Sequence, residues 1–262
     1  MDLVDATAPA SAALGDADVG AVATLIGDPR RARVLIALAD GRALPAGRLA
    51  SEAGVAASTA SEHLAKLRSA GLVEVEAQGR SRYYRLASSQ VALALEALAR
   101  IAPPLPVRSL RQSTHAYALR RARTCYNHLA GRLGVALMAA LLRDGHLVGG
   151  DGRHRPGTGS ADRLSAVGTD VEYRLSSTGR RLFAELGVDL AKVFRHHPAI
   201  RYCVDWTEQQ HHLSGPLGTA LCDRMLALGW LVRIDRPRVI AVTDRGRRRL
   251  TAVLGVDMTW YR

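Results

Sequence analysis

Residues 58–86 of this chain read STASEHLAKLRSAGLVEVEAQGRSRYYRL, and this stretch decides the fold of the N-terminal part. Its first half carries leucines at helical spacing with polar residues between them, which predicts a helix with one buried stripe. Gly71 ends that helix, because glycine tolerates the left-handed conformation of a C-cap. At the start, either Ser58 is the N-cap or Thr59 and Glu62 form a capping box, and the sequence leaves both open.

The second half of the stretch has the pattern of a basic β-hairpin. Val73, Val75 and Ala77 alternate with glutamates, and residues 82–86 return after a turn at 78–81. A helix that starts with small polar residues and is followed by such a hairpin suits the major groove of duplex DNA. The alternative is a surface helix followed by an ordinary hairpin. We expect base edges to be contacted by Ser58, Thr59, Ser61, Glu62 and His63, and the DNA backbone by Lys66, Arg68, Arg80, Arg82 and Tyr83.

Two shorter helices are predicted before this stretch. Asp28 and Pro29 supply the N-cap and first-turn proline of a helix over 30–38, and a second helix over 45–53 is closed by Gly54. The order helix, helix, recognition helix and hairpin resembles the winged helix-turn-helix of the ArsR/SmtB family of bacterial transcription regulators. The resemblance covers about residues 18–102 and rests on Asp28-Pro29-Arg30-Arg31, Val34-Leu35, Leu49-Ala50, Ser61-x-His63-Leu64-x-x-Leu67, Ala70-Gly71-Leu72-Val73, Gly79-Arg80 and Tyr83-Tyr84-x-Leu86.

The resemblance implies a sequence-specific repressor that acts as a homodimer. In that family the subunits are joined through the first helix, here starting near residues 18–26, and through the last helix, here the apolar stretch 88–101. Such a dimer reads two half-sites about one DNA turn apart, ~34–36 Å. Family metal sites use cysteines on the helix before the recognition helix or acidic and histidine clusters on the dimer helices. Residues 45–53 hold no cysteine and 88–101 no histidine, so we expect no metal and no cofactor.

The charge of the chain favours a polyanionic partner. Its formal net charge is +12, and the excess lies beyond residue 104, because residues 1–104 hold 11 basic and 11 acidic side chains. Arginine-rich composition alone explains this excess equally well. The near-neutral N-terminal part supports an alternative function, a winged module that binds a ligand or a protein partner and no longer binds DNA.

Several other classes of protein are disfavoured by the sequence. It has no apolar run of about 18 residues and no basic N-terminal segment, so we expect a cytoplasmic protein without membrane contact. It also lacks a phosphate-binding loop, a Gly-x-Ser-x-Gly elbow and a dinucleotide fingerprint, so we do not expect an enzyme or catalytic residues.

An internal repeat follows a proline-rich linker at residues 102–106. Residues 130–137 match 214–221, 145–148 match 229–232, and 186–189 match 254–257. Each copy is expected to run helix, helix, glycine, strand, turn, strand, helix, as in a winged helix, with its middle helix too apolar to read bases and therefore buried. In the first copy, residues 109–129 are expected to be one long helix whose arginines form a solvated face or contact phosphate.

The expected fold is therefore mainly α with small β-hairpin wings, an α+β class. It comprises a disordered tail (1–16), a winged helix-turn-helix domain (17–102), and two tandem degenerate winged-helix-like units (107–195 and 196–262).

The C-terminal repeat is expected to hold a small organic effector. Aromatic and polar side chains gather at corresponding places in both copies, and His211 with His212 near Trp206 is the first place to look. The candidate residues are Cys125, Tyr126, His128, Cys203, Trp206, His211 and His212. If the copies pack about a local two-fold axis, Cys125 and Cys203 approach each other, and a metal or thiol sensor becomes an alternative. The simpler alternative is that these cysteines and histidines only pack in the core.

Overall fold

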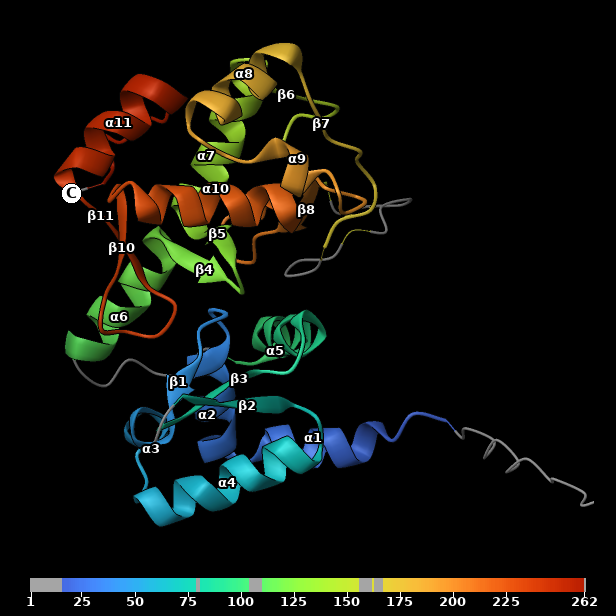
Figure 1. Ribbon diagram of the computed structural model, residues 1–262, viewed down its shortest axis with the longest axis vertical. Helices are drawn as coiled ribbons and strands as arrows, with labels where there is room; N and C mark the ends of the chain where they lie inside the picture. Colours follow the sequence, from blue (N-terminus) through green and yellow to red (C-terminus); the bar gives the residue numbers. More distant parts are fainter. Residues whose placement is uncertain (1–15, 79–80, 104–109, 156–161, 163–166, 262) are drawn as a thin grey trace, which may run out of the picture.

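The computed structural model describes residues 16–78, 81–103, 110–155, 162 and 167–261. Figure 1 shows an N-terminal part, drawn in blue to teal, below a C-terminal part drawn in green to red. Each part has a hydrophobic core of its own. The predicted tail lies outside the described residues, apart from Asp16.

The N-terminal part is a winged helix-turn-helix, as predicted. Its small antiparallel sheet has the strand order β1-β3-β2. Leu64 and Leu67 of α4 are buried together with leucines of α2 and α3. The elements are α1 (Val19–Gly27), α2 (Pro29–Leu38), β1 (Leu44–Pro45), α3 (Ala46–Ala53), α4 (Ala57–Ser69), β2 (Val73–Gln78), β3 (Ser81–Leu86) and α5 (Ser89–Ile101).

The helix ends confirm most of the predicted capping residues. The Asp28 carboxylate accepts hydrogen bonds from the backbone N–H groups of Arg30 and Arg31, and Gly54 closes α3 in the left-handed conformation with φ 69°. The start of α4 differs from the prediction. The helix begins at Ala57 and its N-cap residue, Ala56, makes no side-chain cap. The residues proposed as caps therefore lie in the first turn, where their hydroxyl groups belong to the helix surface.

The C-terminal part repeats one element order, which is hairpin, helix, two paired strands and helix. In the first copy these are β4 (Arg123–Cys125), β5 (His128–Ala130), α7 (Gly131–Arg143), β6 (Leu147–Val148), β7 (Arg174–Leu175) and α8 (Ser177–Glu185), after α6 (Leu110–Arg121). In the second copy they are β8 (Arg201–Val204), β9 (His211–Ser214), α10 (Gly215–Ala227), β10 (Leu231–Arg233), β11 (Ile240–Val242) and α11 (Asp244–Leu254), with α9 (Leu190–Val193) between the copies.

The hairpins that open each copy correct the sequence-based expectation. The predicted helix over 109–129 ends at Arg121 and gives way to β4 and β5. The chain reverses at Tyr126, whose φ of 57° lies outside the right-handed helical region. The second copy likewise opens with β8 and β9 where a helix was expected. The later part of the predicted order, strand, turn, strand and helix, is present in both copies.

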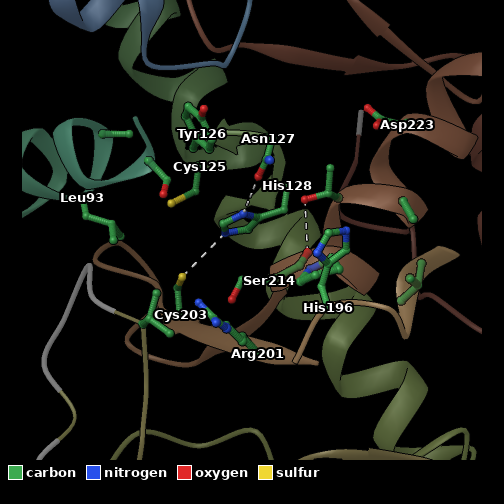
Figure 2. A pocket seen from close by; sticks show the side chains of 18 of the residues that line it. Leu93, Cys125, Tyr126, Asn127, His128, His196, Arg201, Cys203, Ser214 and Asp223 are labelled. Atoms are coloured by element: carbon green, nitrogen blue, oxygen red, sulfur yellow. Dashed lines mark hydrogen bonds between the residues drawn. The ribbon is translucent and has the colours of Figure 1, made fainter. Parts of the chain in front are cut away.

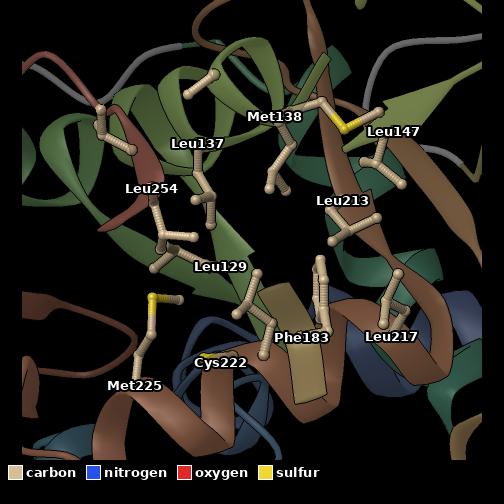
Figure 3. Close-up of a cluster of buried hydrophobic side chains, with 14 of the residues drawn as sticks. Leu129, Leu137, Met138, Leu147, Phe183, Leu213, Leu217, Cys222, Met225 and Leu254 are labelled. Atoms are coloured by element: carbon tan, nitrogen blue, oxygen red, sulfur yellow. The ribbon is translucent and has the colours of Figure 1, made fainter. Parts of the chain in front are cut away.

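The two copies pack reciprocally and share one core. Strand β5 of the first copy lies against α10 of the second, and β9 of the second lies against α7 of the first. A Cβ added at Gly134 or Gly218 would lie 3.4 Å from the Cβ of His212 or His128, respectively, so corresponding positions make corresponding contacts. Figure 3 shows leucines of both copies in this core. The apolar helices α7 and α10 are largely buried, as expected from their composition.

Charged side chains connect the two parts. Arg238, in the loop between β10 and β11, pairs with Glu96 of α5 and donates to the backbone oxygen of Thr124 at 3.2 Å. In the same region Arg233 lies 3.6 Å from Asp40. Burial lowers the pKa of Arg238 to about 10, so it stays charged at neutral pH. Among the helices that the structure describes, none is long and apolar enough to cross a lipid bilayer.

Candidate functional site

Helix α4 presents an exposed polar ridge at the edge of the N-terminal part that is farthest from the C-terminal part (Figure 1). The ridge is held by buried Leu64 and Leu67, which are 1% and 0% exposed. The Ser61 hydroxyl donates to the Ala57 backbone oxygen at 2.9 Å and keeps its own oxygen at the surface. The exposed ridge residues are Ser58, Ser61, Glu62, Lys66 and Arg68, and Thr59 is half-buried beside them.

His63 does not belong to this ridge. Its side chain is 9% exposed, and both ring nitrogens are buried without a hydrogen-bond partner in the described part of the chain. It lies near Asp28, whose carboxylate pKa is lowered chiefly by the hydrogen bond from the Arg31 backbone N–H. This burial corrects the expectation that His63 faces base edges.

The hairpin of β2 and β3 lies next to α4 (Figure 1). Arg82 is exposed near its tip and Tyr83 is half-buried where β3 pairs with β1. Arg80 lies outside the described residues. An exposed ion pair of 2.5 Å joins Arg85 to Glu74 across the two strands and braces the hairpin.

A pocket of about 590 Å³ opens between α5 and the C-terminal part, a size suited to a small organic molecule. Ser89, Leu93 and Glu96 of α5 form one wall. The opposite walls come from the turn between β4 and β5 and from α9 and α10 (Figure 2). Lys192 and Arg201 add positive charge to the lining, and Asp223 adds a carboxylate.

Four of the seven predicted effector residues line this pocket, namely Cys125, Tyr126, His128 and Cys203. The other three, Trp206, His211 and His212, are not among its lining residues. His211 lies with its Nδ1 2.8 Å from the Tyr173 hydroxyl and stacks on Tyr202 with ring centroids 4.1 Å apart. Burial lowers the pKa of His211 to about 4, so it is neutral. The Trp206 ring covers the Arg123 guanidinium at 4.9 Å.

Behind the pocket lies a buried charge network that the sequence did not indicate. The Arg123 guanidinium donates to the Asp205 carboxylate at 2.8 Å, and the Gly131 backbone N–H donates to the same oxygen at 2.8 Å. His212 Nδ1 lies 3.3 Å from Asp205. The arginines at 108–123 had been expected on a helix face that is solvated or contacts phosphate, and only the hairpin fold turns Arg123 inward. In the sequence, the only indication of this network was Asp205 next to Trp206.

These contacts shift the pKa values of the network. Burial alone would raise the pKa of Asp205, but His212 and the Arg123 guanidinium hold it far below its usual range. Burial alone would lower the pKa of His212, but the neighbouring Asp205 carboxylate raises it to about 9. Within the thiol pair, contact with Cys125 lowers the pKa of Cys203, and contact with Cys203 raises the pKa of Cys125.

The same place holds a group of side chains able to bind a metal ion. The ligand atoms of Cys125, His128, Cys203 and His212 all lie within 4.8 Å of one another, and all four residues are buried. The expectation that the two cysteines of the two copies approach each other is thus confirmed. Thiolate and imidazole are donors that zinc prefers.

The chain is similar in sequence to proteins named as HTH-type transcriptional regulators. A family model described as a helix-turn-helix domain matches residues 26–76. The uncharacterized HTH-type transcriptional regulator YdfF of Bacillus subtilis (strain 168) is 39% identical over 231 residues, covering 88% of this chain and 94% of the relative. The HTH-type transcriptional regulator CmtR of Mycobacterium tuberculosis (strain ATCC 25618 / H37Rv) is 43% identical over 76 residues, covering 29% of this chain and 64% of the relative.

Two solved structures each cover about a third of this chain. The NMR structure of the cadmium metal-sensor CMTR from Mycobacterium tuberculosis is 34% identical and covers 35% of this chain and 94% of that chain, with a TM-score of 0.29. Reduced HlyU from Vibrio cholerae N16961 is 30% identical and covers 32% of this chain and 88% of that chain, with a TM-score of 0.30. Since the match to YdfF spans the N-terminal and C-terminal parts together, this chain belongs to the HTH-type transcriptional regulators of the ArsR type.

Proposed function

We propose that this chain is a cytoplasmic repressor that binds a specific DNA operator as a homodimer and responds to a small organic effector. The observation that carries the proposal is the exposed polar ridge of α4, backed by buried leucines and lying beside a hairpin with a basic tip. A ridge of this kind fits a major groove, where short polar side chains reach base edges. In this proposal residues 17–102 bind DNA, and 107–195 with 196–262 form the effector-binding part.

The ridge divides into two kinds of DNA contact. Ser58, Ser61 and Glu62, near the N-terminal end of α4, are placed to meet base edges, with Thr59 beside them. Lys66 and Arg68, in the last turn, are placed to meet phosphates. Arg82 and Tyr83 of the hairpin, with Arg80, extend the backbone contacts.

Exposed apolar side chains on α1 and α5 support the dimer. Val19 and Val22 are 72% and 39% exposed and lie three residues apart, on one face of α1. Leu98 and Ile101 are 43% and 74% exposed and have the same spacing on α5. A second copy would cover both pairs and remove their apolar surface from water.

The pocket is placed to influence DNA binding. Helix α5 forms one wall of the pocket and also carries Leu98 and Ile101 of the proposed dimer face. A ligand that prefers one position of α5 would shift the arrangement of the two recognition helices and hence the affinity for DNA.

A mobility-shift assay tests the DNA function. At about 150 mM salt the protein should bind the DNA upstream of its own gene at least ~10³-fold more tightly than a scrambled duplex. Ser61→Ala should reduce that ratio and leave binding to the scrambled duplex unchanged. Equal binding of both duplexes by the wild type would favour the winged module that no longer reads DNA.

Filling the pocket tests the effector. Ala220→Trp should leave operator binding intact and should abolish any release of DNA by the low-molecular-weight fraction of the host cell extract. Release that is unaffected by the substitution would place the effector somewhere else.

A further inference from the structure

The two opening hairpins of the C-terminal copies each present one cysteine opposite one histidine. In the β4–β5 hairpin Cys125 is the cross-strand partner of His128, and in the β8–β9 hairpin Cys203 is the partner of His212. Residues directly opposite on antiparallel strands project their side chains on the same face, with Cβ atoms about 4.5–5.5 Å apart. Each hairpin therefore offers a thiol and an imidazole side by side.

The reciprocal packing of the copies brings these two pairs face to face. His128 Nε2 lies 3.3 Å from His212 Nε2 and 3.6 Å from the Cys203 sulfur. Figure 2 shows the sulfurs of Cys125 and Cys203 on the same side of the His128 ring, with a dashed line from the Cys203 sulfur to that ring. All four side chains are buried, and their exposed fractions range from 1% to 6%. Two donors from each copy thus surround a single point between the hairpins.

The outer nitrogens of both imidazoles face oxygen atoms. His212 Nδ1 lies 3.3 Å from Asp205, whose carboxylate is itself held by Arg123 and the Gly131 backbone N–H. His128 Nδ1 lies 3.4 Å from the Asn127 side-chain oxygen. Histidines that bind a metal usually donate their other N–H to a carboxylate or carbonyl oxygen in this way. The Nε2 atoms of the two imidazoles lie 3.3 Å apart, so once deprotonated both can donate to one cation bound between the hairpins.

We propose that Cys125, His128, Cys203 and His212 bind one zinc ion. Two thiolates and two imidazoles that are buried together are a typical ligand set for structural zinc. The ion joins one copy of the repeat to the other, because each copy supplies two of its ligands. This proposal replaces the sequence-based expectation of no metal. It is independent of DNA binding and of the organic effector, although three of the ligands also line the pocket.

The proposal is tested on the purified full-length protein in the absence of DNA. Elemental analysis should find about one zinc per chain after gel filtration in metal-free buffer. After removal of zinc by a chelator, added Co²⁺ should give the intense visible bands of a tetrahedral cobalt site together with a thiolate-to-cobalt charge-transfer band. Restoring zinc should raise the melting temperature, because an ion that binds only the folded state stabilises it.

The three cysteines provide a matched set of variants. Cys203→Ala should lower the affinity for Co²⁺ by more than about 100-fold, since loss of an outer-shell partner alone typically costs 10–100-fold. Cys222→Ala is the control, because Cys222 is buried in the hydrophobic core and is absent from the ligand group (Figure 3). Its cobalt spectrum should match that of the wild type.

Three results would overturn the proposal. The first is a wild-type protein that contains no zinc and gives no tetrahedral cobalt spectrum. The second is equal Co²⁺ affinity for the Cys203→Ala and Cys222→Ala variants. The third is a Cys125–Cys203 disulfide in freshly purified protein, detected by mass spectrometry under non-reducing conditions. If Cys203→Ala fails to fold, the cobalt spectrum of the wild type still decides whether the metal site exists. Normal operator binding by a wild-type protein that contains no metal would overturn the zinc proposal and leave the proposed regulatory function standing.

Discussion

The chain has only two lysines, and they separate the proposed DNA contacts from the effector pocket. Lys66 is exposed in the last turn of α4, whereas Lys192 lines the pocket. Lys66→Ala should weaken binding to all duplexes alike and reduce the slope of log K against log salt by about 1, because one phosphate contact is lost. Fluorescence anisotropy across a salt series measures this. Lys192→Ala removes the same charge elsewhere and should leave the slope unchanged, and identical slopes for all three proteins would exclude Lys66 from the interface.

The carboxylate of Asp28 should make the N-terminal part sensitive to acid. Its pKa is lowered chiefly by the hydrogen bond from the Arg31 backbone N–H, and it caps α2. A group whose pKa is lower in the folded state contributes stability above its unfolded pKa, and that stability is lost as pH falls through the folded pKa. Asp28→Asn keeps a capping oxygen but does not titrate. Below about pH 4 the variant should therefore lose less stability than the wild type in urea unfolding, and parallel pH profiles would contradict this role.

At the scale of single residues, the sequence located the ridge of α4 but misassigned His63. The buried set of α4 is Ala60, His63, Leu64 and Leu67, which is the spacing of a helical stripe. Position alone thus predicts burial of residue 63. Histidine was placed on the DNA face because of its chemical type, and in this helix the periodicity is the stronger indicator.

Helix α10 can approach its own hairpin only because residue 218 is glycine. A Cβ at Gly218 would lie 2.6 Å from the Leu213 backbone oxygen, which cannot move without distorting β9. Gly218→Ala should therefore lower the free energy of unfolding by about 1–3 kcal/mol, despite the better helix propensity of alanine. Urea denaturation followed by circular dichroism measures the change.

Gly47 provides the control for this prediction. It lies in α3, and a Cβ there would meet no atom within 4 Å. Gly47→Ala should be neutral or stabilising by up to about 1 kcal/mol. A stabilising effect of alanine at both positions would mean that α10 and β9 can separate without cost.

At the scale of elements, the repeat was readable in the sequence but its opening hairpins were not. Matching glycines and apolar runs identified corresponding helices, and these are α7 and α10. Strands β4 and β5 have three residues each, too few for an alternating pattern to show. The second hairpin, β8 with β9, was missed as well. This misplaced His211 and His212, which are neighbours on β9 and therefore face opposite sides of the strand. His211, which contacts Tyr173 and Tyr202, and His212, which belongs to the proposed zinc ligands, therefore lie on opposite faces of β9.

The connection between the two parts depends on a buried ion pair. Glu96 is 4% exposed and its partner is Arg238 from the other part of the chain. Arg238→Met leaves a buried carboxylate unpaired and should lower the free energy of unfolding by about 3–5 kcal/mol. The double variant Glu96→Leu with Arg238→Met should lose less than this single variant does. Additive losses in chemical denaturation would show that the two side chains are not coupled.

At the scale of the whole molecule, the sequence indicated an N-terminal and a C-terminal part but not how they meet. Contacts such as Arg233 with Asp40 join residues far apart in the chain and follow no periodic pattern. The pocket arises from this meeting, so the part played by α5 in lining it could not be predicted. The approach of Cys125 to Cys203 could be predicted, because two copies of a repeated unit that pack on each other bring corresponding segments together.

The central claim is that two copies of α4, held in one dimer, read a specific duplex. It is tested most directly by selecting bound duplexes from a random pool with the full-length protein at about 150 mM salt. The account predicts enrichment of an inverted repeat whose half-sites lie about 10–10.5 base pairs apart, centre to centre. Enrichment of no sequence, or of a single site without two-fold symmetry, would contradict it.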